Sequence, residues 1–234
     1  TNVIQPAGLE GGLEGLWTPV LNNRIGTSGC QLNCVACSNI CPTGALRPLT
    51  LDEKLGRGEF AGAGPVKLGT AFVDRGRCLP WAMDRPCLVC QENCPVSPKA
   101  IYVREVFRTI RGGRREVAAV EGDTVRLAGE PLTPDAYADG DHYCRPAAGG
   151  PRRRIVSNTA GTLTLADEPR WGRRPAADAA EAVDIQIRLG LPQVDPELCI
   201  GCGVCEHECP VSGRRAIRVS ADGETRSRQR TLLP

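Results

Sequence analysis

Residues 199–210, CIGCGVCEHECP, decide the fold because they place four cysteines at C-x2-C-x2-C-x3-C and follow them with a proline. This is the ligand spacing of bacterial-type iron–sulfur sites. Iron–sulfur clusters select soft thiolate ligands, and three thiolates two residues apart can surround one small cage. Gly201 and Gly203 leave backbone N–H groups free to approach the sulfur atoms, where hydrogen bonds tune the cluster. Pro210 turns the chain away after the fourth ligand.

Two other uses of clustered cysteines have to be weighed. A zinc ribbon also contains C-x2-C pairs, but normally two pairs that a longer spacer separates. A secreted chain with thirteen cysteines could form a disulfide framework with one thiol left over. Neighbouring cysteines with a following proline bind one metal centre more naturally than they link distant strands. The spacing therefore favours iron–sulfur clusters over both alternatives.

The same pattern occurs twice more, as C-x3-C-x2-C-x3-C-P from Cys30 and as C-x8-C-x2-C-x3-C-P from Cys78. Three runs that share the ending C-x2-C-x3-C-P are an internal repeat. They predict three or more [4Fe-4S] clusters and use twelve of the thirteen cysteines. The predicted ligands are Cys30, Cys34, Cys37 and Cys41 in the first run, Cys78, Cys87, Cys90 and Cys94 in the second, and Cys199, Cys202, Cys205 and Cys209 in the third. The predicted neighbours of the clusters are Pro42, Pro95, Pro210, Gly201 and Gly203.

Composition limits what else the chain can be. Its 234 residues suffice for one or two domains, and aromatic residues make up only 4%. A small core is enough where metal–thiolate bonds hold the fold together. The net charge is +2 and the arginines are scattered, without a basic helix interleaved with aromatics, so nucleic acid is not an expected partner. The sequence contains no apolar stretch of transmembrane length and no visible signal peptide.

Flanking segments repeat along with the ligand runs. A Val-Asp pair ends at Asp74, four residues before Cys78, and another ends at Asp195, four residues before Cys199. A β-prone segment follows each of these runs, at residues 101–103 and 217–219. Strand, ligand loop, helical turn and strand make half of a ferredoxin unit. We expect both aspartates to close the ligand turn through side-chain-to-backbone hydrogen bonds.

Residues 104–192 interrupt the repeat with β-prone runs that turn residues separate. These runs are residues 116–120, 124–127, 154–157, 162–165 and 183–189. Cys144 lies here beside His142, and a buried structural thiol is favoured over a metal ligand. The predicted fold is α+β: tandem bacterial-ferredoxin-like units at 1–103 and 193–220, a small inserted antiparallel β module at 104–192, and an extended tail at 221–234.

Several short segments also carry local signals. Residues 1–6 match residues 43–48, which follow Cys41-Pro42, so we expect a further ligand run upstream and with it a fourth cluster; chance is the alternative explanation of the match. Residues 8–15 can form a short helix, but their glycines weaken it; residues 51–67 are expected to form a loop, and residues 176–182 can add one or two helical turns. The loop at 79–86 carries Trp81 and is interpreted as a lid over a cluster edge, with a docking ridge as the alternative. His207 is not expected to be a ligand.

With its three Cys-Pro-terminated runs, the extended loop of the second run and the LEGLWTPVL link, the chain resembles the polyferredoxins that accompany periplasmic nitrate reductase and methylamine dehydrogenase maturation. The resemblance covers residues 1–104 and 193–219. It implies a four-cluster electron carrier, exported folded and working with redox subunits and a membrane-bound, quinone-linked partner. It favours a periplasmic or extracytoplasmic location, with a cytoplasmic one as the alternative. The gap in the first run and the β insert depart from the family pattern.

The resemblance also implies how the runs share clusters. Cys94 would complete the cluster of Cys30, Cys34 and Cys37, while Cys41 would complete that of Cys78, Cys87 and Cys90. Cys199, Cys202 and Cys205 would use an upstream cysteine, or Cys209 if the protein begins at Thr1.

The leading functional hypothesis is an electron-transfer subunit without a catalytic site of its own. Each run has four cysteines, so no iron keeps an open position for a substrate. The alternatives are an iron–sulfur component of a catalytic or maturation complex, or a scaffold in which the metal sites are structural and the β insert binds the partner.

Overall fold

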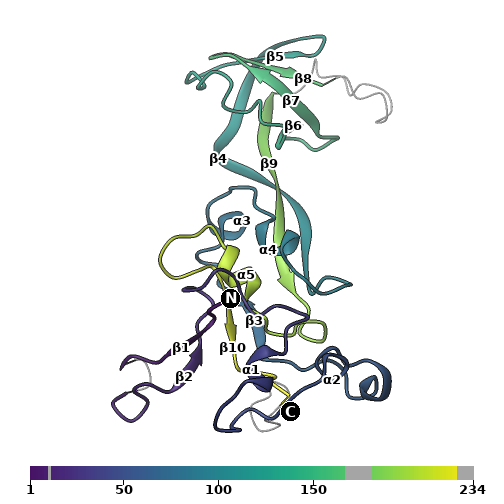
Figure 1. Ribbon diagram of the computed structural model, residues 1–234. Helices are drawn as coiled ribbons and strands as arrows, with labels where there is room; N and C mark the ends of the chain where they lie inside the picture. Colours follow the sequence, from purple (N-terminus) through teal and green to yellow (C-terminus); the bar gives the residue numbers. More distant parts are fainter. Residues whose placement is uncertain (10–11, 167–180, 226–234) are drawn as a thin grey trace. The chain divides into compact units, whose positions relative to one another are not determined.

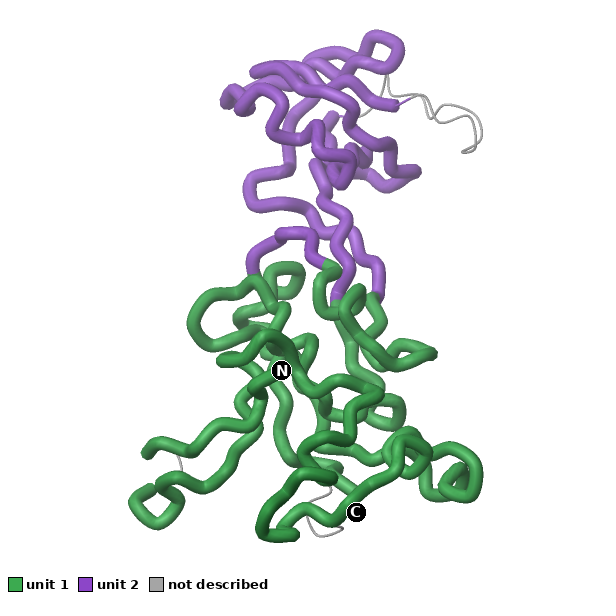
Figure 2. The backbone as a smooth tube through the Cα atoms, viewed as in Figure 1, with its two compact units in different colours: residues 1–82, 88–103, 192–234 green, residues 83–87, 104–191 purple. Residues whose placement is uncertain are grey.

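The structure is a computed structural model that describes residues 1–9, 12–166 and 181–225. The chain forms two compact units, coloured separately in Figure 2. The first unit comprises residues 1–82, 88–103 and 192–234, and the second comprises residues 83–87 and 104–191. In the described part of the chain, no helix is both long enough and apolar enough to cross a membrane.

The first unit is built on two short antiparallel strand pairs. β3 (Thr70–Val73) pairs with β10 (Ile217–Ser220), so the strand before the second ligand run lies beside the strand after the third run (Figure 1). β1 (Ile4–Pro6) pairs with β2 (Pro19–Leu21). The Asp74 N–H donates to the carbonyl of Ala216 at 2.7 Å, just beyond the β3–β10 pairing, and before the third run the Asp195 N–H donates in the same way to the carbonyl of Ala100 at 2.8 Å. The second and third runs are therefore flanked in the same way.

Each ligand run contains a short helix at the same place. In all three, the helix begins two residues after the second cysteine, includes the third cysteine and ends before the fourth. The helices of the second and third runs pack against each other. This common local geometry supports reading the three runs as repeats of one structure. The helices are α1 (Ala36–Asn39), α4 (Val89–Glu92) and α5 (Val204–Glu208).

Residues 51–67 are not the loop that the sequence analysis expected. They contain α2 (Leu51–Leu55) and a 3-10 helix, η2 (Gly58–Phe60). The Glu53 N–H donates to Thr50 Oγ1 at 3.1 Å, which caps the start of α2. Gly56 ends the helix in a left-handed conformation, with φ of +63°. The glycines of this segment predicted a loop, but one of them is the C-terminal cap of the helix.

Three other segments with a local expectation from the sequence have different outcomes. Within residues 8–15, the described part contains turns but no α-helix, because glycine raises the cost of a helix interior. The segment 79–86, which was expected to be a loop, starts with a helical turn, α3 (Leu79–Ala82). On it, the Trp81 indole N–H donates to the carbonyl of Pro192 at 3.3 Å, and the Arg75 guanidinium lies 4.4 Å from the indole ring centre. The helical turns expected at 176–182 lie almost wholly outside the described residues.

The second unit is a closed antiparallel barrel with strand order β4-β5-β8-β7-β6-β9. Its core is apolar: Ile155, Leu163 and Ile185 are fully buried. Strands are present at all five segments that the alternation indicated, whereas the strand around Cys144 carried no such signal. The strands are β4 (Ile101–Glu121), β5 (Thr124–Leu127), β6 (His142–Pro146), β7 (Arg153–Asn158), β8 (Thr162–Leu165) and β9 (Ala182–Val194), of which β4 begins and β9 ends in the first unit.

Candidate metal centre

A cavity in the first unit gathers four cysteines from two ligand runs. Three of them, Cys199, Cys202 and Cys205, belong to the third run, and the fourth, Cys94, ends the second run. The rest of the lining is apolar or backbone: Ala71, Pro95, Ala100, Ile101, Gly201, Gly203 and Val219. Four thiols around an apolar cavity are the donor set that an iron–sulfur cluster requires. The residues of this cavity fit that group.

The loops that carry the first cysteine of the second and third runs are closed by matching turns. The Gly76 N–H donates to Asp74 Oδ1 at 3.1 Å, and the Glu197 N–H donates to Asp195 Oδ1 at 2.9 Å. The N–H groups of Cys78 and Cys199 each donate at 3.0 Å to the carbonyl of the aspartate four residues earlier. The turn-closing role predicted for the two aspartates is confirmed.

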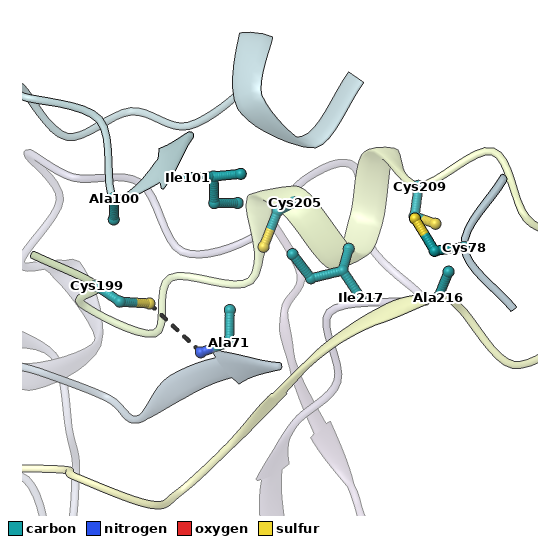
Figure 3. Packing of buried hydrophobic residues seen from close by; sticks show 9 residues of the cluster. All are labelled: Ala71, Cys78, Ala100, Ile101, Cys199, Cys205, Cys209, Ala216 and Ile217. Carbon is teal, nitrogen blue, oxygen red and sulfur yellow. Dashed lines mark hydrogen bonds between the residues drawn. The ribbon is translucent and has the colours of Figure 1, made fainter. Parts of the chain in front are cut away.

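Gly201 and Gly203 allow other backbone segments to come close to the third run. Their φ angles are +66° and +76°, a region that residues with a Cβ atom rarely adopt. A Cβ on Gly201 would lie 2.4 Å from the backbone nitrogen of Gly69, and one on Gly203 would lie 2.0 Å from the Asn23 side chain. The backbone N–H of Ala71 also reaches the run, donating to Cys199 Sγ at 3.4 Å (Figure 3). The third run is thus held by segments far away in the sequence.

Burial favours the protonated thiol at two of the cysteines that line this cavity, Cys202 and Cys205. Loss of solvation raises the pKa of Cys202 from 9.0 to about 11, and it raises the pKa of Cys205 well above its ordinary value. Neighbouring cysteines, Cys94 among them, add to both shifts. Because metals bind the thiolate, loading this site has to release protons.

Cysteines from the same two runs also meet at a second place in the first unit. Cys78 and Cys209 are buried in one core cluster with Ala216 and Ile217, and Figure 3 draws their side chains close together. Cys90 is partly buried and packs against this cluster. The Arg77 guanidinium holds the chain after Cys209 in place by donating to the carbonyls of Ser212 and Arg214 at 3.2 Å and 2.8 Å. Cys87, the other cysteine of the second run, belongs to the segment 83–87 of the second unit.

These positions differ from the sharing of ligands that the resemblance implied. Cys94 lines a cavity with Cys199, Cys202 and Cys205, whereas the resemblance implied that it joins Cys30, Cys34 and Cys37. The physical reason is the pairing of β3 with β10 and the packing of α4 on α5, which fold the second and third runs into one body.

The first run lies beside the third. The Cys30 N–H donates to the carbonyl of Cys202 at 2.6 Å, and a Cβ on Gly29 would lie 2.4 Å from that oxygen. Its cysteines are more accessible than those of the third run, and Cys37 is exposed. Hydrogen bonds from the backbone of Leu46 and from Thr43 lower the pKa of Cys41 to about 7. Lys54, which the sequence analysis did not single out, donates to Cys30 Sγ at 3.5 Å.

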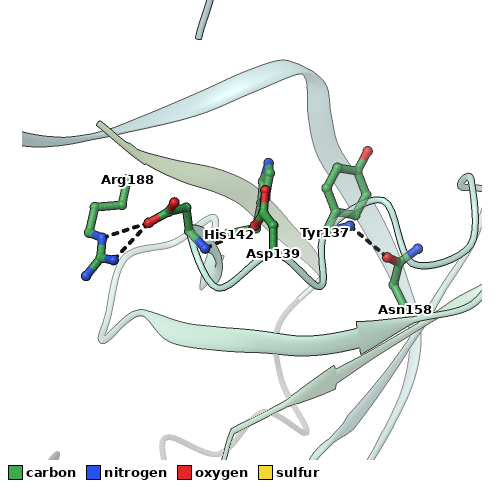
Figure 4. Close-up of polar contacts among 6 residues, drawn as sticks. Tyr137, Asp139, His142, Asn158 and Arg188 are labelled. Atoms are coloured by element: carbon green, nitrogen blue, oxygen red, sulfur yellow. Dashed lines mark hydrogen bonds and ion pairs between the residues drawn. The ribbon is translucent and has the colours of Figure 1, made fainter. Parts of the chain in front are cut away.

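The two histidines have other partners. His207 Nδ1 lies 3.0 Å from the carbonyl oxygen of Asn23. His142 Nδ1 lies 2.7 Å from Asp139 Oδ1, in a polar group that anchors a barrel loop (Figure 4). In the same group, the Tyr137 N–H donates to Asn158 Oδ1 at 3.0 Å. Throughout the described residues, no three His, Cys, Asp or Glu side chains converge closely enough to hold a single metal ion.

Cys144 is buried in the apolar core of the barrel, as expected of a structural thiol. Its neighbours in that core include Ile155 and Ile185.

Comparison with known proteins agrees with the geometry of the third run. The family described as "4Fe-4S binding domain" matches residues 192–213, which contain all four cysteines of that run. Residues 192–213 are a 4Fe-4S binding domain. This domain implies one 4Fe-4S cluster and an iron–sulfur, ferredoxin-like protein with a role in electron transfer. No curated protein and no solved structure matches the chain.

Proposed function

We propose that the chain is an electron-transfer subunit that carries several [4Fe-4S] clusters. The observation that carries the proposal is the cavity in which Cys94 of the second run joins three cysteines of the 4Fe-4S binding domain. In two-cluster ferredoxins the fourth cysteine of a run ligates the other cluster. A ligand set that crosses between runs is the arrangement expected when two clusters share one small fold.

The same exchange assigns the second cluster of this body. Cys78 and Cys90 would hold it together with Cys209, whose thiol is buried in the same core as that of Cys78. The first run would hold a further cluster next to the third run. With four thiolates on each cluster, the protein's part is to bind the clusters, keep water from them and set their potentials, while the bound clusters supply one-electron transfer.

The partners are proposed from the resemblance. Redox subunits of a larger complex would deliver and accept the electrons, and a membrane-bound, quinone-linked protein would be one of them. The barrel favours a second role, as a docking module within a catalytic or maturation complex. It is a compact unit with an apolar core of its own, and it contains only one of the twelve predicted ligands, Cys87.

Cys94→Ser tests the crossed ligand set, with Cys144→Ala as the matched control. Anaerobically purified wild-type protein should absorb near about 400 nm and bleach with dithionite, as redox-active clusters do. We expect Cys94→Ser to lose about four irons per chain and the corresponding share of the bleachable absorption. Cys144→Ala should keep both. A colourless zinc protein, or a Cys94→Ser variant with full iron content, would contradict the proposal.

A further inference from the structure

The chain contains few lysines, and each of them lies next to a ligand run. Only three of the 29 basic residues are lysines. Each lysine donates to two backbone carbonyls beside a different run, at residues 31 and 34, 91 and 92, or 196 and 197. In a sequence that otherwise uses arginine, this placement points to a requirement for a compact ammonium group at these sites. The three are Lys54 at the first run, Lys99 at the second and Lys67 at the third.

Lys54 has the contact that bears on a cluster. Its Nζ donates to Cys30 Sγ at 3.5 Å, to the carbonyl of Gln31 at 2.8 Å and to the carbonyl of Cys34. An ammonium has three N–H donors, so these three acceptors use all of them. The planar fork of an arginine would not converge on acceptors arranged in this way.

Helix α2 holds this ammonium in position. Thr50 caps the start of the helix and Gly56 its end, as described above. Beyond the cap, the Val66 N–H donates to the carbonyl of Lys54 itself at 3.0 Å. Lys54 is half-buried, so water screens its charge less than that of a fully exposed side chain. A fixed, poorly screened positive charge therefore lies against a predicted cluster ligand.

We propose that Lys54 is a tuning residue that raises the reduction potential of the cluster held by the first run. Reduction by one electron adds one negative charge at the thiolates and the iron they hold, and no bond to a cysteine breaks. A nearby ammonium, and a hydrogen bond to a ligand sulfur, both favour that more negative state. The proposal rests on the proposed function, because it requires the first run to bind a cluster.

The test is an anaerobic redox titration of the full chain with dithionite, followed by electron paramagnetic resonance. The signal of the first-run cluster is defined as the one that disappears in Cys34→Ser. Its presence in the wild type tests cluster binding by this run, separately from the role of Lys54. We expect Lys54→Met to shift the midpoint of this signal downward by about 59 mV, a tenfold change in the ratio of oxidised to reduced cluster.

Three further variants separate charge from loop support. Lys54→Gln keeps a hydrogen-bond donor without charge and should shift the midpoint downward, but by less than Lys54→Met does. Lys54→Arg keeps the charge and should stay nearer the wild type. Arg57→Gln removes an exposed charge from the chain just after α2 and should leave the midpoint unchanged. An unshifted midpoint in both neutral variants overturns the proposal. So does loss of the first-run signal in both, which would assign Lys54 to holding the loop.

Discussion

The cysteines of this protein fall into two groups that differ in the residues around them. The cysteines of the ligand runs lie among other cysteines, as in the cavity that joins Cys94 to the third run. Cys144 instead lies among aliphatic side chains in the barrel, with no ligand run around it. One residue type therefore serves two purposes, and its neighbours decide which.

The surroundings of Cys144 predict a thiol that does not react in the folded protein. Burial raises its pKa from 9.0 to about 12. The folded state thus prefers the neutral thiol, so this residue stabilises the fold below the unfolded pKa and that contribution is lost as pH rises toward the folded pKa. We expect iodoacetamide to leave Cys144 unmodified near pH 9 in the native protein and to modify it in denaturant, as mass spectrometry would detect. Rapid alkylation of the native protein would show that the barrel core is open.

Residue roles could be predicted from the sequence where the partner is close along the chain. Asp74 and Asp195 accept from N–H groups two residues later, and the Val-Asp repeat was enough to predict both turns. The ligand set of Cys94 could not be predicted in this way. It depends on the pairing of β3 with β10, strands about 150 residues apart in the sequence. The sulfur contact of Lys54 likewise depends on a helix that the sequence analysis did not expect.

At the scale of the element, short helices and glycine turns place the ligands. α2 could have been found from the sequence, because Thr50 followed by Glu53 is a capping signal. The close approach of Gly69 to the third run could not, because those segments are joined only through the tertiary fold. Gly201 stands at that approach, with a left-handed φ and no room for a Cβ.

Gly201→Ala should therefore weaken the third run. The added methyl group would lie 2.4 Å from the backbone nitrogen of Gly69, and φ would stay at +66°. We expect a loss of about 1–3 kcal/mol of stability, since strained backbone costs that much, and a lower iron content per chain. Gly161→Ala, where nothing lies within 4 Å and φ is not positive, is the control. Equal iron content and equal melting temperatures for the two variants would count against this account.

At the scale of the whole molecule, the chain folds as two compact units with separate cores. The core of the first is small and cysteine-rich, with Ala71, Ala100, Ile101, Ala216 and Ile217 as its buried aliphatic part. A core this small fits a fold that relies on metal–thiolate bonds. The barrel has a conventional aliphatic core. Alternation in the sequence predicted its strands at 124–127 and 162–165. The closure of the barrel, however, requires β4 and β9 to be neighbours, and local sequence patterns do not predict which distant strands become neighbours.

This division predicts that the barrel and the clusters can be perturbed separately. Ile185 is fully buried in the barrel core, so Ile185→Ala should lower the free energy of unfolding of the second unit by about 2–5 kcal/mol. Val156→Ala, at a side chain 47% exposed on the same barrel, should change it far less. Because the first unit has its own core, the dithionite-bleachable absorption of Ile185→Ala should remain at the wild-type level. Calorimetry of the anaerobic protein, recorded with the visible spectrum, measures both. Loss of the visible absorption in step with the barrel transition would mean that the cluster sites depend on the barrel for their stability.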